Sequence, residues 1–258
     1  MALNLVLHTF RMIFGNFGQA LRVSVGPYLL LMILAGVVFV VFGQGMTGTQ
    51  VNGQMPPGFA LGFILLIPLF LFVTAWVAVS WHRFILLEEY AGILPAVTDR
   101  PIWPYAGKVI LMSLLMMVAM IPLMLVFMII GVPFIEAPGF SASFSIVGII
   151  MAIVFIVFFS VLSLRLGVAL VGTALGKPMT FGAAWRVTKT INKTIIGVAV
   201  ILGVLNILSG TILTALGAMT PLLGSILSLG LNWLTMMIGI SILTTIYGHV
   251  IEDRPLIS

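Results

Sequence analysis

The chain has 258 residues, of which 62% are hydrophobic and only 7% are charged, and its mean hydropathy is +1.31. A soluble domain is nearer half apolar and about a quarter charged, so this composition excludes a water-soluble globule and indicates an integral membrane protein. The absence of cysteine excludes disulfides and thiolate metal sites, and the 11 Lys and Arg residues are too dispersed to form a patch for nucleic acid.

Residues 3–22 show the pattern of an amphipathic helix. They lack the basic start, compact apolar centre and small-residue cleavage site of a signal peptide. Apolar residues recur every three or four positions, with polar residues on the opposite side. The apolar side consists of Leu3, Val6, Leu7, Phe10, Ile13, Phe14, Phe17 and Leu21. We expect this helix either to lie on the membrane surface or to pack against the end of a helical bundle.

Six stretches are long and apolar enough to cross a bilayer, which requires roughly 20 residues in a helix. They are residues 23–43, 58–81, 106–133, 144–165, 194–218 and 222–246. The connections 44–57, 134–143 and 219–221 carry one charge among them, Glu136, whereas the other connections are longer and charged. The sequence therefore predicts an all-α integral membrane protein, a single membrane domain over 1–258, whose six transmembrane helices form three hairpins.

The distribution of basic residues predicts the orientation. If both termini face the cytoplasm, every Lys and Arg lies on the cytoplasmic side, as the positive-inside rule requires. These residues are Arg11, Arg22, Arg83, Arg100, Lys108, Arg165, Lys177, Arg186, Lys189, Lys193 and Arg254. We therefore expect a multi-pass protein of the bacterial inner membrane with cytoplasmic N- and C-termini.

The stretch WHRFILLEEY at 81–90 gathers scarce charges where the second predicted helix leaves the membrane. At 1.5 Å per residue the helix places His82 and Arg83 at headgroup depth, with Glu88 and Glu89 in the cytoplasm. Neither carboxylate is three or four residues from Arg83, so a pair within the helix is disfavoured.

Two interpretations of this charge cluster remain open. The carboxylates of Glu88 and Glu89 meet basic side chains of a neighbouring unit, such as Arg165 or Arg186, or the stretch is a solvated helix end. A metal site is disfavoured, because His82 and Glu89 are seven residues apart and helical ligands are usually four apart.

The segments 95–108 and 180–193 occupy the same place before the later hairpins as 3–22 does before the first. In 180–193 one side is apolar and the other is basic, with Arg186, Lys189 and Lys193. In 95–108 two prolines would break a long helix. The chain therefore divides into three pseudo-repeat units, about 1–94, 95–177 and 178–258, each an interfacial segment on the cytoplasmic face followed by a hairpin.

Polar residues inside the predicted spans are few. Asn206 and Asn232 lie at similar depth in the last two helices and are expected to hydrogen-bond to each other. Catalytic motifs such as GxSxG, HExxH and a P-loop are absent, and so is any pair of intramembrane carboxylates. We therefore expect no enzymatic activity and no cofactor.

Three stretches, HTFRMIFGNFGQAL, KPMTFGAAWRVTKT and AVSWHRFILLEE, resemble a membrane-domain superfamily of bacterial proteins. Its members include a domain fused to glycerophosphoryl diester phosphodiesterases and the stand-alone YciC-like proteins. The resemblance implies a six-span bundle, largely of unassigned function. It transfers no catalytic residues, because the soluble phosphodiesterase domain has no counterpart in this sequence.

The function expected from the sequence is a non-enzymatic one. The basic amphipathic segments would interact with membrane lipids, with another membrane protein or with a second copy of the chain. The alternative is a small transporter or permease, which would show polar or broken helices at corresponding depths of its repeats.

Overall fold

The computed structural model describes residues 1–42, 58–135 and 146–256, and all regular structure in these ranges is helical. The elements are α1 (Ala2–Gly15), α2 (Phe17–Phe42), α3 (Phe59–Leu87), α4 (Ile102–Ile135), α5 (Ile146–Ala174), α6 (Phe181–Thr188), a 3₁₀ turn (Lys189–Ile191), α7 (Asn192–Met219) and α8 (Pro221–Ile251). In this part of the chain six helices, α2 to α5, α7 and α8, are long and apolar enough to cross a membrane. The predicted all-α membrane protein is therefore confirmed.

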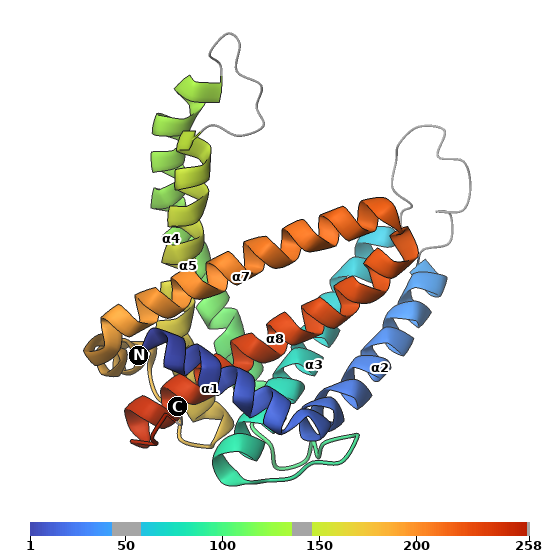
Figure 1. Cartoon of the computed structure of the whole chain (residues 1–258). Coiled ribbons are helices and arrows are strands. Elements are labelled where there is room, and N and C mark those ends of the chain that lie inside the picture. The colour runs from blue at the N-terminus through green and yellow to red at the C-terminus, as the bar shows by residue number, and fades with distance from the viewer. Residues whose placement is uncertain (43–57, 136–145, 257–258) are drawn as a thin grey trace.

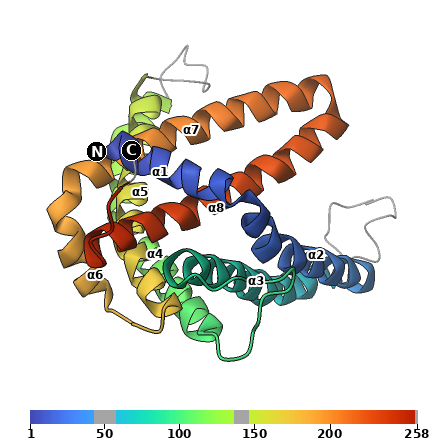
Figure 2. The ribbon, with the colours of Figure 1, turned by 60° about the horizontal axis from the view of Figure 1, so that its bottom comes forward.

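The long helices fan out from one end of the molecule (Figure 1). Helix α2 packs against α3, α4 against α5, and α7 against α8. The connections 43–57 and 136–145 lie outside the described residues, so the arrangement as three hairpins stays a prediction. Helix α8 runs between α1 and α3 and also contacts α5 and α7, which makes it the central helix of the bundle (Figure 2).

The buried core lies at the end from which the helices diverge. We call it the charged end; it comprises α1, α6 and the turns at 88–101 and 175–180, and both termini lie there (Figure 1). Many of the buried side chains come from the second half of α3 (73–86), the end of α5 (164–174) and the last part of α8 (237–247). Away from this end, large apolar side chains are exposed, as expected for helices whose solvent is lipid.

Helix α1 is shorter than the predicted amphipathic helix. It ends at Gly15, and Asn16 interrupts the helix with φ −120° and ψ 31° while its side chain donates to the Met12 carbonyl. Residues 17–22 therefore belong to the membrane helix α2. The prediction of one helix over 3–22 is wrong, because the apolar spacing continues across the break and gives no signal of it.

One side of α1 packs on the bundle. Leu5, Thr9 and Ile13 are fully buried, and the Thr9 hydroxyl lies 3.4 Å from that of Thr245 in α8. Leu3, Leu7 and Phe14 stay exposed. The structure thus favours the expected docking against the bundle, and the exposed apolar residues form a separate stripe along the helix.

The other two interfacial segments differ from each other. Residues 95–101 are irregular, and α4 begins at Ile102 with Pro104 in its first turn, where proline is tolerated. Residues 180–193 contain α6, capped by Thr180, whose hydroxyl accepts from the Ala183 N–H at 3.1 Å. The division into three pseudo-repeat units stays a prediction.

Candidate functional site

The charged stretch 81–90 folds back on itself at the end of α3. The helix stops at Leu87 because Glu88 takes a left-handed conformation with φ 56°, which is uncommon outside glycine. This turn returns the side chain of Glu89 to the helix. Arg83 donates two hydrogen bonds to the Glu89 carboxylate, from Nε to Oε2 at 2.9 Å and from Nη2 to Oε1 at 2.6 Å.

A second arginine completes this cluster. Arg100, from the irregular segment before α4, also donates to Glu89, so one carboxylate lies between two guanidinium groups. Partial burial, and then the positive charge of Arg83, lower the pKa of Arg100 below its ordinary value. The ordinary pKa of arginine is so high that Arg100 remains a cation at neutral pH. We call this group the Arg83–Glu89–Arg100 cluster.

Arginines at the charged end also bind the free carbonyl groups of helix ends. Arg83 donates to the Ala174 carbonyl of α5 at 3.1 Å. Arg254 donates to the carbonyls of Ile85 and Leu86 in α3, at 3.4 and 2.8 Å. The last carbonyls of a helix have no partner within it, and a cation there also complements the helix dipole. Arg83 therefore links the end of α3 to that of α5, and Arg254 links the segment after α8 to the end of α3, a role that the sequence did not indicate.

The prediction that Arg165 or Arg186 meets the carboxylates is wrong for Glu89. Arg165 is 5% exposed, its guanidinium stacks over the Trp185 ring at 4.2 Å, and its Nη2 donates to Asn192. Its Nε is buried without a hydrogen-bond partner in the described structure. The two side chains do not meet because Arg165 points towards α6 and the start of α7, whereas Glu89 lies beside the C-terminal end of α5.

His82 is fully buried inside the protein and does not contact lipid or water. The Thr244 hydroxyl donates to the Ile240 carbonyl, so it accepts from Nδ1 of His82 at 2.8 Å. Nε2 is then left to accept from the Tyr105 hydroxyl at 3.3 Å. The imidazole thereby connects α3, α4 and α8.

The basic side of the 180–193 segment is exposed. Arg186, Lys189 and Lys193 are all solvent-accessible, whereas Ala184 and Thr188 on the opposite side are fully buried against the bundle. Between Glu136 and Glu252 the sequence contains five Lys and Arg residues and no Asp or Glu. This part of the charged end therefore carries positive charge, and its own segment of the sequence has no acidic residue to neutralise it.

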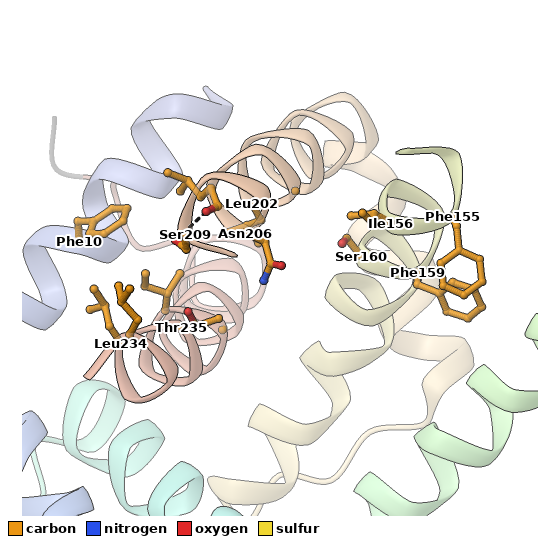
Figure 3. A pocket seen from close by; sticks show the side chains of 15 residues that line it. Phe10, Phe155, Ile156, Phe159, Ser160, Leu202, Asn206, Ser209, Leu234 and Thr235 are labelled. Atoms are coloured by element: carbon orange, nitrogen blue, oxygen red, sulfur yellow. Dashed lines mark hydrogen bonds between the residues drawn. The ribbon is translucent and has the colours of Figure 1, made fainter. Parts of the chain in front are cut away.

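The two intramembrane asparagines do not meet. Asn232 donates to the Ser228 carbonyl one turn earlier in α8, at 2.8 Å, and the predicted amide pair is wrong. Equal depth does not fix the side of a helix from which a residue projects. Asn206 instead lines a cavity of about 540 Å³ between α5, α7 and α8, with Phe10 of α1 at one end (Figure 3).

The cavity wall is mostly apolar, with four small polar side chains. Ser160 comes from α5, Asn206 and Ser209 from α7, and Thr235 from α8. Ser209 donates to the Leu205 carbonyl of its own helix at 2.8 Å. Among the described residues, none forms a hydrogen bond with the side chain of Asn206, Ser160 or Thr235. Ser160, Ser209 and Thr235 could not be identified as lining residues from the sequence, since serine and threonine are common in membrane helices.

The described residues contain no group of three or more His, Asp or Glu side chains that could hold a metal ion. No family model, no curated protein and no solved structure matches this chain. The resemblance to YciC-like membrane proteins therefore stays a prediction.

Proposed function

We propose that this is a non-enzymatic protein of the bacterial inner membrane that binds anionic phospholipid headgroups on the cytoplasmic side. The observation that carries the proposal is the exposed basic face of Arg186, Lys189 and Lys193. The opposite side of the same segment is anchored in the bundle, so the three cations are held at the level where α6 meets the long helices.

Two neighbouring features support a headgroup site. Trp185 is 41% exposed next to this face, and tryptophan is enriched at membrane interfaces. Arg165, stacked beneath the same indole, has no salt bridge among the described residues. A buried cation is costly without an anion, and a lipid phosphate would supply one. The positive charge of Arg165 and of the basic face therefore favours a negatively charged lipid over a zwitterionic one.

Replacing Arg186, Lys189 and Lys193 together with glutamine is expected to weaken binding of phosphatidylglycerol by about tenfold. Each cation near an anionic surface contributes about 1 kcal/mol before screening by salt, so a combined loss of about 1.4 kcal/mol is a conservative expectation. Native mass spectrometry of the full chain in mild detergent would measure retained phosphatidylglycerol, with phosphatidylcholine as the reference lipid.

The matched control replaces three other exposed cations, Arg11, Arg22 and Lys177, with glutamine. It removes the same net charge from other places. Wild-type protein that retains both lipids equally contradicts the proposal. An equal loss of phosphatidylglycerol binding in the two triple variants contradicts the assignment of the site to the basic face.

A further inference from the structure

The cavity between α5, α7 and α8 is separate from the basic face. Its lining includes Phe155, Phe159 and Phe10 among other apolar side chains, and no charged residue. Asn206 is the fifteenth residue of the 28 in α7, so it lies near the middle of a helix that is long enough to cross the membrane. Polar groups at such depth are costly when they have no partner.

The size of the cavity limits what can fill it. Ligand sites in proteins commonly enclose about 300–1,000 Å³, and 540 Å³ falls within that range. Asn206, Thr235 and Gly239 of its lining are exposed, so the cavity opens to the lipid that surrounds the helices. A lipid of the bilayer can therefore enter from the side, and a flexible hydrocarbon chain can follow the space between the three helices.

We propose that this cavity binds a neutral lipid that carries a hydroxyl or ester carbonyl group, with the chemistry of a diacylglycerol. The apolar wall accommodates acyl chains. The amide of Asn206 can donate to a carbonyl and accept from a hydroxyl, and Ser160 lies on the facing wall (Figure 3). A charged headgroup is excluded because the lining offers no counter-charge at that depth.

Two glycines of α8 provide a matched test. Gly239 lines the cavity and Gly230 does not, and a Cβ added at either position meets nothing within 4 Å. Gly239→Leu fills the cavity, and Gly230→Leu makes the same chemical change on the exposed surface of the same helix. Both variants are expected to fold, because a Cβ at either position has open space around it.

Binding of dioleoylglycerol to the full chain in detergent, measured by native mass spectrometry, is expected to be lost in Gly239→Leu and kept in Gly230→Leu. Asn206→Leu is expected to weaken binding about fivefold, since one intramembrane hydrogen bond is lost. Phosphatidylglycerol binding serves as the internal control, because it depends on the basic face and not on the cavity.

The outcomes separate the two proposals. Equal dioleoylglycerol binding by wild type, Gly239→Leu and Gly230→Leu overturns the cavity site, whether or not phosphatidylglycerol binds. Wild type that retains no dioleoylglycerol also overturns it. Loss in Gly239→Leu alone, with phosphatidylglycerol binding unchanged, supports the cavity site and excludes a folding defect as the cause.

Discussion

His82→Ala is expected to lower the free energy of unfolding in detergent by about 3 kcal/mol. His82 is fully buried where α3, α4 and α8 meet, so its removal leaves a cavity in the core of the charged end. It also removes the donor to the Thr244 hydroxyl and leaves the buried Tyr105 hydroxyl without its acceptor. Chemical denaturation followed by tryptophan fluorescence would measure the change.

Two milder variants resolve the parts of this effect. Tyr105→Phe removes only the 3.3 Å hydrogen bond and is expected to cost about 1 kcal/mol. His82→Asn keeps an N–H donor near the position of Nδ1 and is expected to fall between Tyr105→Phe and His82→Ala. A loss below about 1 kcal/mol for His82→Ala would show that this buried contact does not hold the helices together.

Glu89→Gln is expected to destabilise the protein by about 2 kcal/mol, between the values typical of exposed and of buried ion pairs. The side chains of Arg83, Glu89 and Arg100 are 17, 31 and 27% exposed, so water screens this cluster only in part. Without the carboxylate charge, two guanidinium groups remain close together and repel each other. Thermal unfolding in detergent would detect the loss.

The adjacent carboxylate is the matched control. Glu88→Gln removes the same charge one residue earlier and is expected to change stability by less than about 0.5 kcal/mol. A double-mutant cycle of Glu89→Gln with Arg100→Gln should show coupling above about 0.5 kcal/mol, whereas the cycle with Arg165→Gln should show none. Coupling of Glu89 to Arg165 instead of Arg100 would contradict the geometry of the cluster.

The spans could be predicted because crossing a bilayer is a local property of length and hydropathy. The pairing of Glu89 could not, because the spacing rule that disfavoured Arg83 assumes a continuous helix. The left-handed turn at Glu88 breaks that assumption and lets residues six apart meet. Arg100 was missed as a partner for a similar reason, since it lies in an irregular segment without periodicity.

Burial of His82 was missed because depth along one helix says nothing about what surrounds it. The prediction placed the residue at the lipid boundary, yet α4 and α8 cover it there. Asn206 and Asn232 show the same limit: their predicted depths agree, but Asn206 lines the cavity and Asn232 bonds within its own helix. The spans themselves could be predicted from the sequence, whereas rotations about the helix axes depend on tertiary packing.

The orientation of the chain is the claim on which headgroup binding in the cytoplasmic leaflet depends. Since the protein lacks cysteine, one engineered cysteine gives an unambiguous label. Thr49 lies outside the described residues in the predicted outward-facing connection, and Thr190 is exposed beside Lys189 at the charged end. In intact bacterial spheroplasts, a membrane-impermeant maleimide is expected to label Thr49→Cys at once and Thr190→Cys only after the membrane is permeabilised. Labelling of Thr190→Cys in sealed spheroplasts, with Thr49→Cys protected, would put the basic face on the outside and contradict the account.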